Sequence, residues 1–337
     1  LGGIMAEIAD QSQIQIKKLN IKKGPAVQAL RAQIDKDLYQ TNMLKRLKDT
    51  KKLDIKEGMV DDLIVEDNQI KGVVSKQKSI NSKAVILTTG TYLKADILIG
   101  NQRTRSGPGG EEPSLFLSDN LRKLGFEIIR LKTGTPQRID KATIAYNVLE
   151  EEKGSAEHLF FSNFFKKKYD INKQKSCYLT YTNEKTHKII LDNLSKSSMY
   201  GGIEDLASVG PRYCPSIEDK VVRFSDKKRH QLFLEPMGLK SNEIYIQGFS
   251  TSLPKAVQDE IVHSLKGLEK CKILKYAYAI EYDAVMPTQL KNSLETKKIT
   301  GLFMAGQING TSGYEEAGGQ GLMAGINACL QIDQKEP

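Results

Sequence analysis

The sequence contains few cysteines, no paired-cysteine motif and no long apolar run, and each shortage argues against a class of protein. Its 337 residues include four cysteines that lie far apart, so no CxxC pair signals a zinc site or a dithiol redox centre. No run of about 18 apolar residues occurs, which argues against a membrane-spanning helix. The N-terminus has no basic region that leads into an apolar one, as a secretory signal peptide would. We therefore expect reduced thiols in a bacterial cytoplasm, with a mitochondrial matrix as the alternative.

Two further absences concern the start of the chain and its architecture. The GxGxxG fingerprint that opens the first strand–helix turn of dinucleotide-binding folds is missing. The chain opens on Leu1-Gly2-Gly3 rather than on Met, so we expect a piece of a longer protein whose first βαβ unit precedes residue 1. No internal repeat is present. A hydrophobic content of 39% and a charged content of 27% are enough for a buried core and two domains.

Charge is in excess on the positive side. The formal net charge of +9 permits a polyanionic partner, nucleic acid above all. Charge alone does not decide, since a Lys-rich composition is also common in proteins that bind no nucleic acid. An insertion at 160–176 begins with aromatic rings and lysines interleaved, in the manner of single-stranded RNA binders. A solvated lysine run beside a small aromatic cluster is the plainer alternative.

Glycine, by contrast, is concentrated in Gly301–Gly325, where it makes up eight of 25 residues. Glycine allows a positive φ, a close approach of backbones and exposed N–H groups. The apolar run Leu302–Ala305 begins the segment, so the pattern predicts a strand that ends in glycine and restarts as a helix. Such an exit presents amides and a helix N-terminus to a large or anionic ligand. A loop that merely turns is the alternative, and the density of small residues favours a cofactor.

The first hundred residues predict part of an α/β domain. Apolar spacing predicts a helix over 27–48, followed by extended segments over 53–67, 70–75 and 80–89 that alternate like an antiparallel meander. The last of these contains the run ILTTG, which is typical of a buried central strand whose carboxyl end meets a ligand. An ordinary buried strand has the same pattern.

The rest of the chain predicts an insertion and then a return to the same sheet. After a loop rich in Arg, Gly and Pro at 103–113, Ser114 occupies the N-cap position of a predicted helix. Residues 125–250 alternate short strands with loops, and a further helix opens at Pro254. Strand character returns over 285–305. The predicted division is a first part of the sheet domain over 1–100, an inserted domain over 101–269 and a second part over 270–337.

The second informative segment is Gly210–Phe224, which contains Cys214. Pro215 suits the first turn of a helix, so the spacing predicts Cys214 at the N-cap. The positive helix end and nearby cations would lower the pKa of the thiol and enrich the thiolate, which is the form that performs nucleophilic catalysis. A buried structural cysteine is the alternative. Glu218 and Asp219 are either acid–base groups or first-turn residues that complement the helix dipole.

Two other polar segments are ambiguous. Lys132–Arg138 places two cations and two hydroxyls around Gly and Pro, which suits a phosphate-binding loop or an ordinary turn. Thr182–His187 suits either the positioning of a polar substrate or the start of a helix with Asn183 as its cap. His187 taken alone is more often structural or solvated than catalytic.

Eleven segments, in order and spread over nearly the whole chain, resemble the MnmG (GidA) family of FAD-dependent tRNA uridine 5-carboxymethylaminomethyl modification enzymes. So many matches in order are far more specific than any one glycine motif. The segments are KGPAVQALRAQIDK (23–36), VDDLIVE (60–66), ILTTGTYL (86–93), RLKTGTPQRID (130–140), TNEKTH (182–187), GPRYCPSIEDKVVRF (210–224), HQLFLEP (230–236), SNEIY (241–245), STSLP (250–254), YAIEYD (278–283) and AGQINGTSGYEEA (305–317).

The resemblance implies an α/β fold with a glutathione-reductase-like FAD domain, made of a Rossmann-type sheet and a β-meander, interrupted by an inserted α+β NAD-associated domain. It implies FAD contacts at Val60, Ser114 and Gln307. It also implies that Cys214 attacks carbon 6 of the uridine, which makes carbon 5 nucleophilic toward a folate-derived one-carbon unit. No metal site is expected. The implied NAD(H) segment consists of Gly210, Pro211, Arg212, Tyr213, Cys214, Pro215, Ser216, Ile217, Glu218, Asp219, Lys220, Val221, Val222, Arg223 and Phe224.

The resemblance further implies FAD and NADH as cofactors, methylene-tetrahydrofolate as co-substrate, and tRNA and an MnmE-type GTPase as partners. A homodimer that forms a heterotetramer with MnmE is the implied assembly. The family's N-terminal glycine fingerprint and C-terminal helical domain lie outside this chain, so a fragment is expected. The alternatives are a folate- and FAD-dependent tRNA uridine-5 methyltransferase and a non-catalytic RNA- or partner-binding remnant. The run RYCPSIEDK favours the first reading over the methyltransferase.

Overall fold

The computed structural model describes residues 3–164, 169–203, 210, 215–311 and 313–336. Contacts divide the chain into two compact units, each assembled from segments that are distant in sequence. What we call the first unit comprises Leu1–Ile55, Thr135–Gly201 and Pro215–Tyr278. What we call the second unit comprises Lys56–Gly134, Gly202–Cys214 and Ala279–Pro337.

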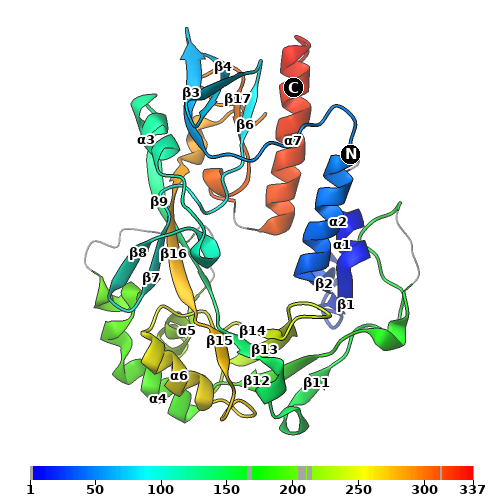
Figure 1. Cartoon of the computed structure of the whole chain (residues 1–337). Coiled ribbons are helices and arrows are strands. Elements are labelled where there is room, and N and C mark those ends of the chain that lie inside the picture. Colours follow the sequence, from blue (N-terminus) through cyan, green and yellow to red (C-terminus); the bar gives the residue numbers. More distant parts are fainter. Residues whose placement is uncertain (1–2, 165–168, 204–209, 211–214, 312, 337) are drawn as a thin grey trace. The chain divides into compact units, whose positions relative to one another are not determined.

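The first unit is built around a six-stranded antiparallel sheet in the order β11-β12-β13-β14-β10-β15 (Figure 1). Alternation explains its packing: in β14, Ile244 and Ile246 are buried while their neighbours are partly exposed. The strands are β10 (Arg138–Asp140), β11 (Glu150–Glu152), β12 (Cys177–Tyr181), β13 (Gln231–Pro236), β14 (Glu243–Gln247) and β15 (Ile273–Lys275).

Three helices, α4 (Glu184–Asp192), α5 (Ile217–Arg223) and α6 (Lys255–His263), contribute apolar side chains to the core of this sheet. The α6 stripe confirms the predicted helix after Pro254, because Val257 and Ile261 are buried one turn apart.

The N-terminal part of the first unit corrects one prediction. Residues 27–48 do not form one helix: β2 (Ala29–Ile34) pairs antiparallel with β1 (Gln13–Leu19), and only Lys36–Lys48 is helical, as α2. The Asp35 side chain accepts the Leu38 N–H at 3.0 Å and so begins the helix. The apolar spacing of Ala29–Ile34 suits a strand as well as a helix, and pairing with a distant strand decides. A short helix, α1 (Met5–Ser12), precedes β1.

Hydrogen bonds explain why residues 1–55 group with the sheet of the first unit. The Gln15 side-chain amide donates to the carbonyls of Glu152 and Lys175, at 2.8 and 2.9 Å. Arg31 forms an ion pair with Glu235 of β13. The units therefore divide the chain at other places than the predicted domains (1–100, 101–269 and 270–337), and the cofactor roles of those domains stay predictions.

The predicted meander of the second unit is confirmed in part: β3, β4 and β5 pair antiparallel in sequence order. The third predicted segment, 80–89, is not one strand, because it divides between β5 and β6 and β6 pairs with β17. Asp67 and Asn68 have φ of 49° and 57°, as a two-residue hairpin turn requires. Short 3-10 turns and one π turn connect elements elsewhere. The second-unit elements are β3 (Val60–Glu66), β4 (Gln69–Ser75), β5 (Lys78–Asn81), β6 (Val85–Leu87), β7 (Asp96–Ile99), β8 (Gln102–Arg105), α3 (Phe116–Lys123), β9 (Ile128–Thr135), β16 (Tyr278–Val285), β17 (Leu302–Met304), the 3-10 turn η9 (Gly306–Asn309) and α7 (Tyr314–Ile332).

The glycine-rich segment folds as predicted into a strand, a turn and a helix. β17 pairs parallel with β6, and Phe303 and Ala305 pack with Ala324 and Ala328 of α7. The prediction that β6 is a buried central strand is wrong, because the Ile86 side chain is exposed and β17 is the partner of β6 among the described strands. No helix among the described residues is long and apolar enough to cross a membrane.

Ser114 does not cap the helix that follows it, contrary to the prediction. α3 begins at Phe116, its N-cap position is Leu115, and no side chain caps it. Ser114 is instead buried beside Leu93, with its N–H donating to the Tyr92 carbonyl at 2.9 Å and its carbonyl accepting from Lys94 at 2.8 Å. This backbone pairing makes Ser114 part of a β-bridge with Leu93 and not the N-cap of a helix.

Candidate functional site

The carboxyl ends of β6 and β17 form one edge of the second unit. The strands are parallel, with Leu87 opposite Met304, and the Ala305 N–H donates to the Leu87 carbonyl at 3.0 Å. The segments that begin at residues 88 and 305 therefore leave the pair on the same side. The carboxyl edge of parallel strands is where α/β folds bind ligands.

A buried hydroxyl without a partner lies at this edge. The Thr89 side-chain oxygen is buried and makes no hydrogen bond within the described part of the chain. An unpaired buried hydroxyl costs about 1–3 kcal/mol, so such a group marks a place where a polar ligand atom fits. Gly306, across the pair, has φ +83°, and a Cβ there would lie 3.5 Å from the Ala317 side chain. This left-handed turn lets the chain leave β17 sharply.

Gln307 is held in one orientation at the same edge. The hydroxyl of Tyr282 on β16 donates to Gln307 Oε1 at 2.5 Å. Tyr282 is fully buried, and this burial raises its pKa to about 12, so the phenol stays a neutral donor. The Gly306 N–H donates to the Gln320 side chain of α7 at 2.9 Å. The turn after β17 is thus fixed by contacts from both β16 and α7.

The three predicted FAD residues all lie in the second unit and border one apolar cluster. Val60 begins β3 and packs against the cluster that contains Leu87, Leu93 and Ile308. Ser114 is bridged to Leu93, and Gln307 precedes Ile308. The fold therefore brings residues 60, 114 and 307 around a common core, while their contact with FAD stays a prediction. Sequence reasoning missed Thr89 and Tyr282, which only the parallel strand pair and the cross-strand bond reveal.

The segment Gly210–Phe224 is only partly described. Residues 211–214, and with them Cys214, lie outside the described residues. The prediction that Cys214 caps the following helix is wrong, because the N-cap of α5 is Ser216. Its hydroxyl accepts the Asp219 N–H at 3.1 Å, and the Asp219 carboxylate accepts the Ser216 N–H at 3.0 Å. This reciprocal capping box needs a hydroxyl followed three residues later by a carboxylate, so it selects Ser216 over a thiol.

Glu218 is a buried anchor rather than an exposed acid–base group. Its Oε1 accepts hydrogen bonds from the Ser197 and Thr251 hydroxyls, at 2.9 and 2.8 Å, and from the Ser252 N–H at 3.2 Å. Burial raises the pKa of Glu218, and these hydrogen bonds oppose that shift. The carboxyl ties α5 to two loops of the first unit. The dipole-complementing role proposed for one of the two acids falls to Asp219, which also accepts from the Tyr200 hydroxyl at 2.7 Å.

The ambiguous segments have structural roles where the structure describes them. Asn183 caps α4 in a capping box with Thr186, which confirms the helix-start alternative. His187 Nε2 lies 2.8 Å from the Thr182 hydroxyl, and burial lowers the pKa of its ring. The segment Lys132–Arg138 forms the end of β9 and the start of β10, and the Gln137 amide between them donates to the Gln258 side chain at 3.0 Å.

Two of the described thiols are unsuited to catalysis. Burial raises the pKa of Cys177 and of Cys271 to about 12, so both remain protonated at neutral pH. Cys329 is exposed. Among the described residues, no group of three or more His, Cys, Asp or Glu side chains is placed to hold a metal ion.

Comparison with known proteins identifies relatives along the whole chain. A family profile described as "Glucose inhibited division protein A" matches residues 1–336. The tRNA uridine 5-carboxymethylaminomethyl modification enzyme MnmG of Mycoplasma mobile is 55% identical over 337 residues, which are 100% of this chain and 54% of that protein. The MnmG of Acholeplasma laidlawii is also 55% identical and is covered to 54%. The crystal structure of Aquifex aeolicus GidA superposes with a TM-score of 0.93 at 49% identity, covering 100% of this chain and 57% of that one. The chain thus spans about half the length of the curated relatives it matches.

Proposed function

The chain belongs to the glucose inhibited division protein A (GidA) family, and we propose that it forms part of a tRNA-modifying flavoenzyme. The proposed enzyme installs the carboxymethylaminomethyl group at carbon 5 of the wobble uridine, with FAD, NADH and a one-carbon unit from methylene-tetrahydrofolate. The observation that carries this proposal is the identity of 52–55% to enzymes of that description over the full length of the chain. We further propose a homodimer that assembles with an MnmE-type GTPase.

The edge formed by β6 and β17 fits a flavin nucleotide. The Thr89 hydroxyl is buried without a partner, and the left-handed Gly306 and the fixed amide of Gln307 lie at the same edge. We propose that Val60, Ser114 and Gln307 hold FAD, within a glutathione-reductase-like domain. FAD, when bound, supplies reversible two-electron transfer. The chain's own contribution is to bind and orient the cofactor through polar groups that are already positioned before it arrives.

We propose that Gly210–Phe224 associates with NADH and that Cys214 is the nucleophile. The match of the segment GPRYCPSIEDKVVRF to the family supports this. The capping box of Ser216 and the buried Glu218 fix the N-cap of α5, which lies two residues after Cys214. The thiolate adds to carbon 6 of the uridine, which makes carbon 5 nucleophilic. Once carbon 5 has gained its new substituent, it must lose its proton before the thiolate departs and the aromatic ring is restored.

A substitution tests the nucleophile in the full-length protein. Cys214→Ser keeps the size of the side chain and removes the thiolate, so we expect unchanged flavin content and a fall in modification of about 10³-fold or more. Modified nucleosides of tRNA are measured by mass spectrometry after incubation. Cys329→Ser, at an exposed position outside the proposed chemistry, is the matched control and should retain full activity. A Cys214→Ser protein that modifies tRNA at the wild-type rate would contradict the nucleophile role.

The reaction itself is tested in a strain that lacks the gene. Loss of 5-carboxymethylaminomethyl-type wobble uridines, restored by the wild-type gene, is the expected result. Loss of ribothymidine instead would support the tRNA uridine-5 methyltransferase. A purified full-length protein that lacks the visible absorbance of flavin, even after FAD is supplied, would support a non-catalytic remnant. Co-purification with the GTPase tests the proposed assembly separately from the chemistry.

A further inference from the structure

The four-stranded sheet of the second unit has an apolar cluster on one face and a row of charges on the other. Its strands run in the order β8-β7-β16-β9 (Figure 1). Successive residues of a strand point to opposite faces, so Tyr282 of β16 lies on one face, and Glu281 and Asp283 lie on the other. Tyr282 packs there with Leu131 and Ala284. On the opposite face, the charged side chains of Glu281 and Asp283 therefore lie between the buried apolar side chains of Ala279 and Val285.

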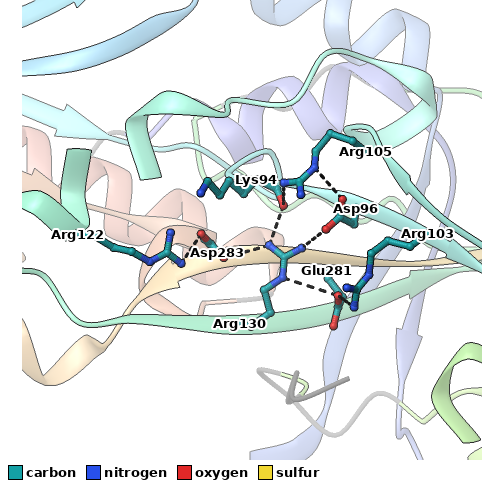
Figure 2. Close-up of a pocket in the computed structure, with 8 residues that line it drawn as sticks. All are labelled: Lys94, Asp96, Arg103, Arg105, Arg122, Arg130, Glu281 and Asp283. Atoms are coloured by element: carbon teal, nitrogen blue, oxygen red, sulfur yellow. Dashed lines mark hydrogen bonds and ion pairs between the residues drawn. The ribbon is translucent and has the colours of Figure 1, made fainter. Parts of the chain in front are cut away.

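Cross-strand pairing aligns these charges in a row. Arg105 on β8 is opposite Asp96 on β7, and Asp96 is opposite Glu281 on β16. Arg130 on β9 extends across the row, with Nη2 2.6 Å from the Asp96 carboxylate and Nη1 3.0 Å from that of Asp283, as Figure 2 shows. One guanidinium thus joins carboxylates of two different strands. The row is built from segments nearly 190 residues apart in the chain.

The charged side chains enclose a cavity whose floor is acidic and whose rim is basic. The three carboxylate side chains are exposed by only 2–5%. Those of Arg103, Arg105 and Arg122 are exposed by 42%, 49% and 43%. An ion that enters from solvent therefore meets guanidinium groups before it meets the carboxylates of the floor. The lining residues of this cavity of about 400 Å³ are Lys94, Asp96, Arg103, Arg105, Arg122, Arg130, Glu281 and Asp283.

The balance of charges exceeds what the floor needs. Five cations and three carboxylates line the cavity, a formal excess of two positive charges. Asp119, outside the lining, forms ion pairs with Lys94 and Arg122, and counting it lowers the excess to one positive charge. Three buried carboxylates require three positive charges, and Arg130, which contacts two of them at 3.0 Å or less, supplies one. The three exposed arginines of the rim complete this compensation and leave one positive charge over.

The carboxylates of the floor orient the arginines of the rim. Arg105 Nε lies 3.0 Å from Asp96, and Arg103 Nη2 lies 3.3 Å from Glu281. Arg122 Nη2 lies 2.8 Å from Asp283. A guanidinium has five N–H donors in a rigid fork, so a bond to the floor fixes its plane and leaves further donors. Arg105 Nη1 also donates to the Lys94 carbonyl and Arg122 Nη1 to the Ser118 hydroxyl. Fixed forks lose little side-chain entropy on binding, which favours an oxyanion ligand.

We propose that this cavity is a phosphate-binding subsite. It receives a phosphate group either of an RNA backbone or of a nicotinamide dinucleotide, since both offer oxyanion oxygens that match guanidinium forks. The RNA source rests on the proposed function, whereas the phosphate chemistry rests only on the cavity. Arg103 and Arg105, on the exposed strand β8, make the outermost contacts.

The test compares two double variants of the full-length protein. Arg103→Ala/Arg105→Ala removes two cations from the rim, and Lys78→Ala/Lys83→Ala removes two exposed cations from the meander and the turn after it in the same unit. Binding of fluorescein-labelled tRNA is measured by anisotropy over a range of salt concentrations, and binding of NADH by its fluorescence. Circular dichroism and flavin content confirm that both variants fold. Arg103→Lys/Arg105→Lys keeps the charge and removes the fork.

We expect the arginine variant to bind one of the two ligands about tenfold more weakly or worse, with the lysine control close to wild type. If the ligand is RNA, the slope of log K against log salt also falls by about one to two, as expected for two lost phosphate contacts. A change confined to NADH identifies the dinucleotide as the source. The Arg→Lys variant should be intermediate, because a point charge cannot bind two oxygens at once.

Equal binding of both ligands by Arg103→Ala/Arg105→Ala and by the control Lys78→Ala/Lys83→Ala would overturn the proposal. The experiments can contradict the phosphate subsite and the proposed function independently of each other. A protein that modifies wobble uridine but shows no difference between the variants contradicts only the subsite. A protein in which the arginine variant selectively loses phosphate binding, in a strain whose wobble uridines are unaffected by loss of the gene, contradicts only the proposed reaction.

Discussion

The two units bury carboxylates in different ways. In the first unit, Glu218 is surrounded by two hydroxyls and an amide, and its second oxygen has no partner among the described residues. In the second unit, Asp96 and Asp283 are buried beneath guanidinium groups that face solvent. A carboxylate held by neutral donors fixes two pieces of backbone to each other. A carboxylate held by arginines also fixes cations, and those cations are then positioned for a ligand.

The largest effect that separates the two arrangements is expected from Asp283→Ala. This change leaves Arg122 and Arg130 without a shared carboxylate and removes the acceptor of Ser118. Breaking a fully buried ion pair costs about 3–5 kcal/mol, and partial exposure of both arginines reduces the expected loss to about 2–3 kcal/mol.

Urea unfolding of the full-length protein measures this loss. Asp333→Ala is the control, because its ion pair with Lys335 is exposed on both sides, and it should change the unfolding free energy by less than about 0.5 kcal/mol. If Asp283→Ala and Asp333→Ala lower the unfolding free energy by the same small amount, the buried carboxylate of the cavity contributes little to stability. The proposed difference between the carboxylates of the two units would then be wrong.

A smaller effect is expected at Glu218. Glu218→Ala leaves the donors of Ser197, Thr251 and Ser252 without their acceptor, which should lower the unfolding free energy by about 1–3 kcal/mol. Glu218→Gln keeps an acceptor oxygen and should cost less than Glu218→Ala.

The pH dependence of Glu218→Gln sharpens the comparison. Burial raises the pKa of Glu218 above its ordinary 4.5, so the folded protein binds this proton more tightly than the unfolded chain does. The stability that comes from the protonated form is complete below the unfolded pKa and is lost as pH rises through the folded pKa. The advantage of wild type over Glu218→Gln should therefore shrink as the pH rises above the ordinary pKa of 4.5 toward the raised pKa of the folded protein. An advantage that grows with pH would show that the carboxylate, rather than the acid, is the preferred buried form.

The smallest effect concerns the described thiols and leaves stability unchanged. Cys177 and Cys271 are buried with pKa values of about 12, so iodoacetamide at neutral pH should leave both unmodified in the native protein. Cys329 is exposed and should react. Peptide mass spectrometry after a short exposure reports each site separately. Rapid labelling of Cys177 or Cys271 would mean that the core around that thiol opens on the timescale of the reaction.

Local patterns were predicted well because the responsible contacts are close in sequence. The meander Val60–Asn81 and the cap at Asn183 follow from alternation and from one side chain three residues before its partner. The strand, turn and helix at 302–332 follow from an apolar run, glycines and small residues.

Features that depend on distant partners were not predicted. Strand β2 was interpreted as part of a helix because Ala29–Ile34 has an ambiguous pattern that only pairing with β1 resolves. Ser114 looked like a cap, although its backbone is bridged to Leu93. Each arginine of the cavity is unremarkable where it stands in the sequence. Arg103 and Glu281, for example, are 178 positions apart, and only the sheet places them together.

The two faces of strand β16 contact two different candidate sites. Tyr282 holds Gln307 at one candidate site, while the residues directly before and after it hold the arginines of another. A shift of this strand by one position would exchange the sides, placing a phenol among the ion pairs and a carboxylate in the apolar cluster. Inserting or deleting a single codon within β16 would therefore disrupt both sites at once, whereas a substitution there acts on one of them.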